Sequence, residues 1–202
     1  GTRCGWRQLL PLSKPCWSWS SVDEQRQSKR LFLALWPDDS IRQQLADVQK
    51  TLGHDERLKS ARPVPFGNLH ITTHFLGAVS DDVHTRLRTL LPEVSAQACT
   101  LMIDRWGYFK RAKVIWLGGD APEALIDLVV QTGSCIQACI EGYDQKRFVP
   151  HVTIFRKAHR PAEVDAFDPI EWRIDRFALV ESVTHPQGAE YTVLQEWVLS
   201  SG

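Results

Sequence analysis

The chain has 202 residues, of which 43% are hydrophobic and 24% charged, proportions that are ordinary for a globular protein of one substantial domain. Its 24 basic and 24 acidic residues balance to a formal net charge of zero, whereas proteins that wrap long nucleic-acid duplexes usually carry a basic excess. Any nucleic-acid partner is therefore expected to be bound locally, at an end or at a single nucleotide.

Residues 1–28 lack the hydrophobic periodicity of a folded segment. They contain scattered tryptophans and end in a polar run, and their apolar stretch is interrupted by Pro11, Lys14 and Pro15, which is unlike a secretory signal peptide. We interpret 1–28 as an upstream extension or an appended tail, and we expect the folded domain to occupy 29–202.

From residue 30 onward, apolar runs of strand length alternate with helical repeats that begin near capping residues. The predicted elements are a strand over 30–36, a helix over 41–52, a loop over 61–68, a strand over 69–77, a helix over 81–91, a β-hairpin formed by 100–109 and 113–119, a helix over 122–140, a strand over 147–156, and a final strand pair over 171–182 and 191–199. This order predicts an α+β fold with internal duplication, because two similar strands each follow a helix.

A His-x-Thr pattern occurs in both of these similar strands, as HIT at 70–72 and as HVT at 151–153. Side chains alternate between the two faces of a strand, so the histidine and the threonine of each motif share a face and lie about 7 Å apart. A single tripeptide of this kind is expected by chance. Two copies on apolar strands indicate a site, and a rough two-fold between the halves would bring both motifs to one cleft.

These four side chains, His70, Thr72, His151 and Thr153, suit one kind of chemistry. Opening a 2′,3′-cyclic phosphate requires a base that activates water and an acid that protonates the departing ribose oxygen, on opposite sides of phosphorus. Histidine, with a pKa near 6.5, serves in either role near neutral pH, and threonine hydroxyls donate hydrogen bonds to phosphate oxygens. We therefore expect catalysis without a metal ion or any other cofactor.

The sequence resembles the two-histidine phosphoesterase superfamily, and within it the RNA 2′,3′-cyclic phosphodiesterases, also called 2′-5′ RNA ligases. The resemblance extends from about Arg30 to Trp197 and is carried by the segments RLFLALWPDD, NLHITTHFLG, VIWLGG, PHVTIFRKA and YTVLQEW. It implies a bilobal α+β fold in which two lobes, related by a pseudo-two-fold axis, line a central cleft with antiparallel sheets and carry their helices outside.

The same resemblance implies hydrolysis of RNA 2′,3′-cyclic phosphate ends to 2′-phosphomonoesters, together with reversible 2′-5′ joining of RNA ends without ATP. It implies that His70 is the proton donor and His151 the proton acceptor, roles that spacing alone leaves open. The implied partners are RNA ends or nucleoside 2′,3′-cyclic phosphates, tRNA-like fragments among them, and the protein is expected to be a monomer.

Three further residues are candidates for substrate binding. Arg156 stands where relatives often keep a basic residue near the phosphate, but strict alternation puts it on the face opposite the catalytic pair unless the strand ends or bulges. Phe109 and Phe148 are candidates to stack a base, with burial in the core as the alternative for an aromatic residue in a strand.

The first motif departs from its relatives at Thr73 and His74, where a hydrophobic residue and a small or variable one are usual. Alternation directs Thr73 into the layer behind the cleft and puts His74 on the cleft face with His70 and Thr72. His74 is therefore expected to contact substrate or to lie at the rim of the cleft.

Two other functions compete with this interpretation. A zinc site could use His70 and His74, which have the i, i+4 spacing of ligands on a helix, but in a strand their rings would be about 13 Å apart and could not share an ion. A nucleotide- or RNA-binding module of the same fold, without catalysis, is the second alternative, and the presence of both complete motifs argues against it.

The five cysteines, Cys4, Cys16, Cys99, Cys135 and Cys139, form an odd set without a Cys-x-x-Cys pair. This pattern favours small buried residues in a reducing compartment over a disulfide framework or a metal site. No apolar run approaches the roughly 18 residues that span a membrane. We therefore expect a cytoplasmic protein that does not associate with membranes.

Overall fold

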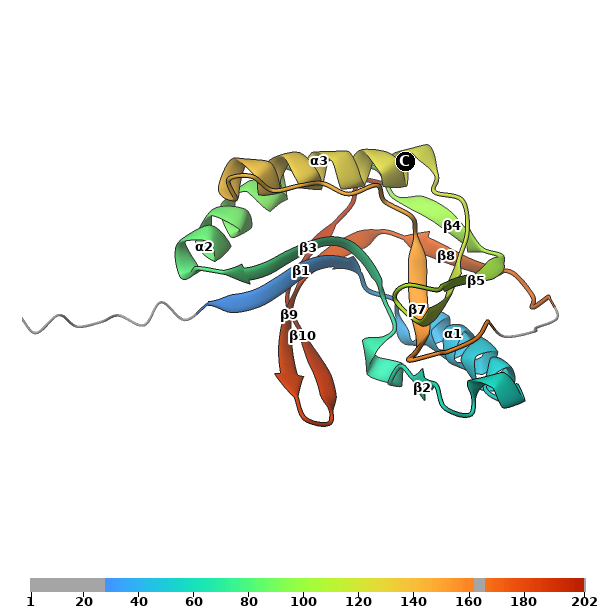
Figure 1. The fold of residues 1–202 in the computed structure, drawn as a ribbon. Coiled ribbons are helices and arrows are strands. Elements are labelled where there is room, and N and C mark those ends of the chain that lie inside the picture. The colour runs from blue at the N-terminus through green and yellow to red at the C-terminus, as the bar shows by residue number, and fades with distance from the viewer. Residues whose placement is uncertain (1–27, 162–165, 202) are drawn as a thin grey trace, which may run out of the picture.

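The computed structural model describes residues 28–161 and 166–201. The predicted extension over 1–28 lies outside these ranges except for its last residue. The described chain has the α+β fold that was predicted, with antiparallel strand pairs throughout both of its sheets. In Figure 1, α2 and α3 lie above β1 and β3, whereas the hairpin of β9 and β10 extends below them.

The helices begin where the sequence offers caps. In α1 (Asp39–Leu52) the Asp38 carboxylate accepts a hydrogen bond from the Ile41 amide at 2.9 Å, and the helix ends at Gly53. Ser80 caps α2 (Asp81–Leu90), and Pro122 precedes α3 (Glu123–Cys139). The three predicted helices are therefore confirmed to within about two residues, which is the usual uncertainty of helix ends.

The strands form a large sheet and a small one. An eight-stranded sheet has the order β10-β9-β1-β3-β7-β6-β5, with β2 added beside β7, and a two-stranded sheet consists of β4 and β8. The strands are β1 (Lys29–Leu35), β2 (Arg62–Pro63), β3 (Ile71–Val79), β4 (Cys99–Ile103), β5 (Arg105–Phe109), β6 (Val114–Gly118), β7 (His151–Arg156), β8 (Ile170–Ile174), β9 (Arg176–His185) and β10 (Gly188–Val198).

Two predicted strands are each divided by an aspartate. The strand expected over 100–109 breaks at Asp104 into β4 and β5, and the one expected over 171–182 breaks at Asp175 into β8 and β9. At each break the next residue, an arginine, donates from Nε to the aspartate carboxylate. The hairpin is therefore β5–β6 alone, because β4 crosses to the small sheet and pairs with β8.

The strand predicted over 147–156 is shorter than expected. It begins only at His151, and residues 147–150 are irregular. Pro150 has no backbone N–H to give to a ladder, which accounts for the late start.

Topology repeats along the chain. The units β1-α1-β3 and β6-α3-β7 each place a His-x-Thr strand antiparallel to the strand that precedes the helix. The breaks described above repeat as well, as Ile-Asp-Arg-Trp at 103–106 and Ile-Asp-Arg-Phe at 174–177. The expected internal duplication is thus present in both the strand order and the local sequence.

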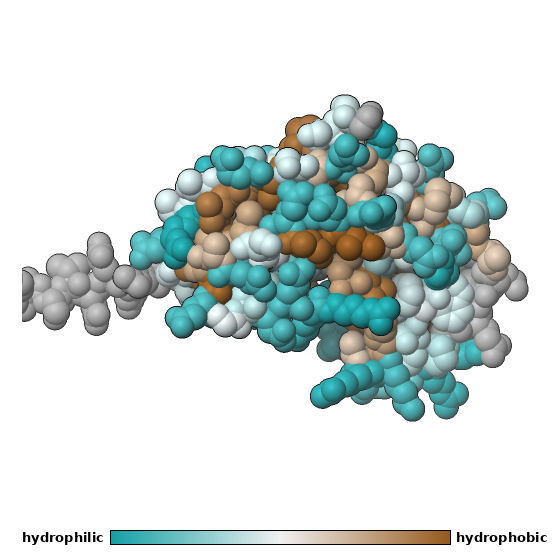
Figure 2. Space-filling model, turned by 90° about the horizontal axis from the view of Figure 1, so that it is seen from above, coloured by the Kyte–Doolittle hydropathy of each residue, from teal (hydrophilic) through white to brown (hydrophobic). Residues whose placement is uncertain are grey.

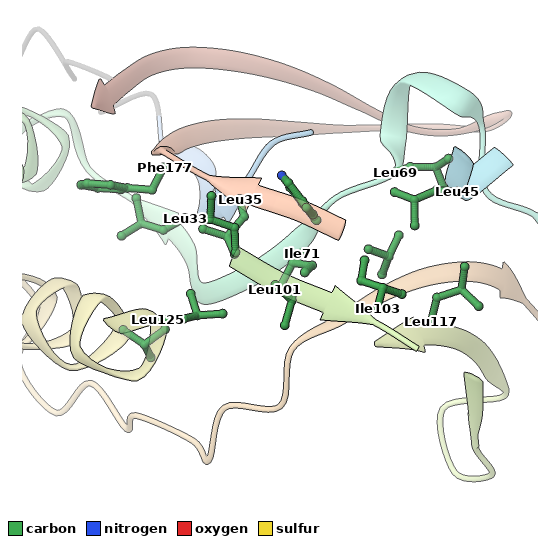
Figure 3. Close-up of a cluster of buried hydrophobic side chains, with 14 of the residues drawn as sticks. Leu33, Leu35, Leu45, Leu69, Ile71, Leu101, Ile103, Leu117, Leu125 and Phe177 are labelled. Carbon is green, nitrogen blue, oxygen red and sulfur yellow. The ribbon is translucent and has the colours of Figure 1, made fainter. Parts of the chain in front are cut away.

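The large sheet buries one face against the helices and the small sheet. On β1, Leu33 and Leu35 belong to the main core together with Ile71, Leu101 and Leu125 of neighbouring elements (Figure 3). The alternate residues of β1 lie on the other face, in a small separate cluster formed by Phe32, Ala34, Ala178 and Val180. This second face carries the residues of the predicted site.

The helix side of the molecule has a mixed surface. Seen from above, hydrophilic and hydrophobic side chains are interspersed on this face, with a hydrophobic band between hydrophilic patches (Figure 2). In the part of the chain that the structure describes, no helix has the length and apolarity to cross a membrane.

Candidate active site

The two histidine rings are held in the same way. His70 stands directly before β3 and His151 opens β7. In each ring Nδ1 lies 2.7 Å from the backbone carbonyl oxygen two residues earlier, that of Asn68 and that of Val149. A carbonyl oxygen only accepts hydrogen bonds, so Nδ1 carries the proton in both neutral rings. Nε2 of each histidine is therefore the atom with a lone pair for proton transfer.

Both motifs open onto one cavity. β3 and β7 pair only at Ile71 and Val152, the central residues of the two motifs, so their flanking side chains emerge together on the opposite face. The cavity has a volume of about 220 Å³. Its lining includes six of the residues predicted from the sequence, His70, Thr72, Phe109, His151, Thr153 and Arg156.

His70 is enclosed by aromatic rings. The rings of Phe32, Trp36 and Tyr191 lie with their centroids 5.1, 5.3 and 5.3 Å from that of the imidazole. This burial disfavours the charged ring and lowers the pKa of His70 from 6.5 to about 4, with smaller contributions in the same direction from Arg156 and His151. In the free protein His70 is therefore neutral near pH 7.

His151 has fewer aromatic neighbours. Phe109 meets its ring edge to face at a centroid distance of 5.2 Å, and Trp116 lies 6.2 Å away. Burial, and then the positive charge of Arg156, lower the pKa of His151 below 6.5. The two histidines thus share a preference for the neutral form while their surroundings differ.

A bulge in β3 reverses the expected position of His74. Ala34 of β1 pairs with Thr72 and Leu33 pairs with His74, so Thr73 is the extra residue between them. His74 and Phe75 are therefore shifted to the other face relative to strict alternation, and a second extra residue, Leu76, restores the original alternation from Gly77 onward. The expectation that His74 lies on the cleft face was wrong, because its side chain points into the core and is only 3% exposed.

His74 is bound to α3 and the segment that follows it. Its Nε2 donates to the Val129 carbonyl at 3.0 Å and lies 3.1 Å from the Thr132 hydroxyl, while Nδ1 accepts from the Tyr143 hydroxyl at 3.0 Å. Burial lowers the pKa of His74, in keeping with a neutral ring. Because His70 and His74 lie on opposite faces of β3, they cannot share a metal ion.

We expect His74→Ala to weaken the fold far more than the adjacent Phe75→Ala. Removing the buried ring leaves a cavity and an unpaired Tyr143 hydroxyl, a combination that costs about 2–4 kcal/mol of unfolding free energy. Phe75 is 71% exposed, so its replacement should cost less than about 1 kcal/mol. Urea unfolding of both variants measures the difference, and equal losses would contradict the structural role of His74.

A matching bulge in β7 brings Arg156 to the site. Thr153 pairs with Trp116 and Phe155 pairs with Ile115, which leaves Ile154 as the extra residue. Arg156 consequently shares the cavity with His151 instead of pointing to the other face. The Ile154 carbonyl accepts hydrogen bonds from the Val64 amide at 2.9 Å and from Gln49 Nε2 of α1 at 2.7 Å, so the bulge leaves this buried group satisfied.

The two motif strands therefore follow the same pattern beyond their threonines. In each, the bulge residue comes three positions after the histidine and a core residue, His74 or Phe155, comes four positions after it. The fifth position returns to the cavity and is Phe75 in β3 and Arg156 in β7. An exposed aromatic ring in one half thus occupies the place of a guanidinium in the other.

The two aromatic candidates are separated. Phe109 lies at the cavity beside His151. Phe148 lies in a different hollow, with Ala121, Ile126 and Val129, where it packs against the main core. The structure therefore does not bring Phe148 to the histidines.

Several residues at the site are not apparent from the motifs. Phe32, Trp36, Tyr191 and Trp116 surround the histidines, and Phe75 lines the cavity. Alternation within RLFLALW puts Phe32 and Trp36 on one face, so the sequence contained a signal from which these two residues could have been found. Phe75 could not be found in this way, because its position depends on the bulge.

In residues 28–161 and 166–201, no group of three or more His, Cys, Asp or Glu side chains is placed to hold a metal ion. The described cysteines, Cys99, Cys135 and Cys139, are free thiols.

Known proteins resemble this chain over most of its length. A sequence model of the 2′-5′ RNA ligase superfamily matches residues 37–186. The RNA 2′,3′-cyclic phosphodiesterase of Escherichia coli (strain K12) is 29% identical over 177 residues, which cover 85% of this chain and 97% of that protein. The RNA 2′,3′-cyclic phosphodiesterase of Archaeoglobus fulgidus is 29% identical over 178 residues, 82% of this chain and 98% of its own.

The fold is similar as well. The crystal structure of E. coli LigT complexed with 3′-AMP matches with a TM-score of 0.76 and 28% sequence identity, and it covers 86% of this chain and 99% of that one. The matched region of each of these proteins includes most of its own length, so the likeness extends well beyond the two motifs.

Proposed function

Because the chain belongs to the 2′-5′ RNA ligase superfamily, we propose that it hydrolyses RNA 2′,3′-cyclic phosphate ends to 2′-phosphomonoesters. Relatives that match most of its length are RNA 2′,3′-cyclic phosphodiesterases. The observation that carries the proposal is the single cavity that both His-x-Thr motifs line.

In the proposed reaction His151 accepts a proton from water as the water oxygen bonds to phosphorus. The bond from phosphorus to the ribose 3′ oxygen breaks on the opposite side, and His70 donates the proton that this oxygen takes up. The 2′ oxygen keeps the phosphate. The assignment of donor and acceptor follows the superfamily alone. The Nδ1 hydrogen bonds are the same in both rings, and they support the use of Nε2 of each ring for the transfer.

Thr72, Thr153 and Arg156 are the groups that we assign to the phosphate. Hydroxyl and guanidinium donors that are already in place stabilise charge as it develops on non-bridging oxygens. In the free protein the Thr72 hydroxyl lies 2.9 Å from Nε2 of His70 and donates to it, since Nδ1 holds the ring proton. We infer that this hydroxyl turns to the phosphate when substrate enters.

The charge on His70 depends on the substrate in this mechanism. With its pKa at about 4, the free ring is neutral near pH 7 and cannot act as an acid. A cyclic phosphate is an anion, and an opposite charge within about 4–6 Å favours the imidazolium. Substrate binding therefore raises the pKa of His70 and gives it the proton that the reaction needs.

Ligation uses the same steps with a different nucleophile. When the 5′-hydroxyl of a second RNA end replaces water at His151, the expelled 3′ oxygen leaves a 2′-5′ phosphodiester. One phosphate ester bond is exchanged for another, so the joining consumes no ATP and is reversible.

We also propose that the two halves of the large sheet act as lobes. One half is β10-β9-β1-β3 and the other is β7-β6-β5 with β2, and they meet through the single backbone pair of Ile71 and Val152. The repeated helix and strand order supports a pseudo-two-fold relation between them, with the substrate cleft at their junction.

The product distinguishes this function from related chemistry. A short RNA ending in a 2′,3′-cyclic phosphate, incubated with the protein and a metal chelator, should give a 2′-phosphate, identified by chromatography against authentic 2′- and 3′-monophosphates. A predominant 3′-phosphate would refute the assigned leaving group. A complete loss of turnover in chelator, restored by zinc or manganese, would refute metal-independent catalysis.

A further inference from the structure

The catalytic cavity is too small for a whole RNA end. Its volume of about 220 Å³ lies below the range of roughly 300–1,000 Å³ that small-molecule sites usually have. A second hollow of about 510 Å³ adjoins it and shares His70, Thr72, Phe75 and Arg156. We call this second hollow the His70 groove, because it includes His70 but not His151.

The proposed mechanism puts the RNA strand on the same side as this groove. In-line displacement separates the attacking water from the departing 3′ oxygen by the phosphorus atom. Water lies toward His151, so the 3′ oxygen and the ribose to which it belongs lie toward His70. The rest of the strand is attached to that ribose and must leave the catalytic cavity on the His70 side.

The floor of the groove has groups that suit a base and a phosphate. Phe75 of β3 pairs with Phe32 of β1, and their rings lie 6.2 Å apart, so Phe75 is supported from below while remaining 71% exposed. Arg30 lies two residues before Phe32 on the same face of β1, about 7 Å farther along the strand. Beside it, β9 contributes the Ser182 and Thr184 hydroxyls.

The charge of the groove favours a polyanion. Arg30 and Arg156 both line it, and neither makes an ion pair with any described residue. No aspartate or glutamate is among its lining residues. A larger hollow of about 1,090 Å³ beside α1 is lined by three aspartates, Asp47, Asp55 and Asp168, and by one cation, Arg57, which is paired with Asp55. Its acidic excess opposes a phosphate chain.

We propose that the His70 groove binds the RNA strand that carries the cyclic phosphate, with the terminal base stacked on Phe75 and the preceding internucleotide phosphate on Arg30. The proposal rests on the function and on the proton-transfer roles given above. It makes an RNA strand of at least two nucleotides the preferred substrate, because a lone nucleoside 2′,3′-cyclic phosphate has no group to reach Arg30.

The test compares two substrates that share a terminal base, a nucleoside 2′,3′-cyclic phosphate and a dinucleotide ending in the same group. For Arg30→Gln, the ratio of kcat/KM for the dinucleotide to that for the mononucleotide should fall about 5- to 30-fold, through KM. The slope of log kcat/KM for the dinucleotide against log salt should become shallower by about 0.7, as for one lost single-strand phosphate contact. A substitution that only perturbed the fold would change neither the ratio of the two kcat/KM values nor the slope against log salt.

Arg111→Gln provides the matched control on the other flank. Arg111 is exposed in the turn after Phe109, and the ring of Phe109 contacts that of His151. If the strand ran past His151, this variant would lose the dinucleotide preference and Arg30→Gln would keep it, which would overturn the proposal. An unchanged ratio in both variants would also overturn it, while hydrolysis of both substrates would leave the proposed function standing. Failure of the unaltered protein to hydrolyse either substrate would count against the function itself.

Phe75 provides an independent measure. Base stacking on an aromatic side chain is lost on truncation, so Phe75→Leu should lower kcat/KM about 5- to 150-fold for both substrates. Equal kinetics for Phe75→Leu and the unaltered protein would remove Phe75 from the proposal.

Discussion

Replacing either His70 or His151 by alanine is expected to lower kcat by about 10²–10⁴-fold, the usual contribution of a general acid or base. The double variant should lose much less than the product of the two single effects, because a site with one histidine already lacks concerted proton transfer. Steady-state kinetics with a 2′,3′-cyclic phosphate substrate measures both effects. His54→Ala, at an exposed histidine after α1, is the control for substitution alone.

The leaving group separates the two roles. A phosphate ester with a nitrophenolate leaving group needs no proton on departure. It should therefore restore turnover to His70→Ala, which lacks the acid, but not to His151→Ala, which lacks the base. The reverse pattern of rescue would exchange the roles, and near-normal turnover of both variants on the natural ester would remove the catalytic interpretation.

The pH dependence follows from the pKa directions of the free protein. In the proposed mechanism the active form has one neutral and one protonated histidine, so kcat/KM should be bell-shaped. Because the pKa values of His70 and His151 are both lowered, the maximum should lie below pH 6.5. The profile of kcat should be displaced to higher pH, since the bound anion stabilises the imidazolium. His151→Ala should lose the acidic limb of the bell and His70→Ala the basic limb.

Arg156→Gln should have the next largest effect. Removing one preorganised donor to a developing oxyanion costs about 10²–10³-fold in kcat. The same substitution removes a positive charge that lowers the pKa of both histidines, so the pKa values of His70 and His151 should rise. NMR titration of the two imidazoles measures this rise without any substrate.

The control for Arg156 is its cross-strand neighbour on the adjacent strand β2. Arg62 of β2 pairs with Arg156 but is exposed outside the cavity lining, so Arg62→Gln should leave both titrations in place. If Arg156→Gln lost activity while the histidine titrations stayed unchanged, Arg156 would be distant from the imidazoles in solution. A fall in their pKa values would contradict the electrostatic argument outright.

The common face of His70 and Thr72, and that of His151 and Thr153, could be predicted from the sequence because it depends only on local rules. Residues two positions apart in a strand point to the same face, so the shared face of each His-x-Thr pair could be predicted without knowledge of the tertiary structure. Helix caps such as Asp38 are equally local, and α1 began within two residues of its prediction. The α+β class followed from the order of these elements.

What could not be predicted depended on how strands meet. Thr73 and Ile154 look like ordinary strand residues, and only pairing with β1 and β6 makes them bulges. His74 was therefore placed on the wrong face, and the choice for Arg156 stayed open. The strand breaks at Asp104 and Asp175 also depend on which strands pair. They were missed because the segments on both sides of each aspartate are apolar and together have the pattern of one continuous strand.

The repeated bulge has a consequence for which side chains the two motif strands can present to the cavity. It divides each motif strand into two parts, the histidine and threonine that we assign to the reaction, and a later position that faces the cavity only because of the extra residue. The side chain at that later position can differ, as with Phe75 in one half and Arg156 in the other, while the histidine and the threonine keep their places on the strand. The same backbone device can therefore present either a stacking surface or a positive charge to the cavity.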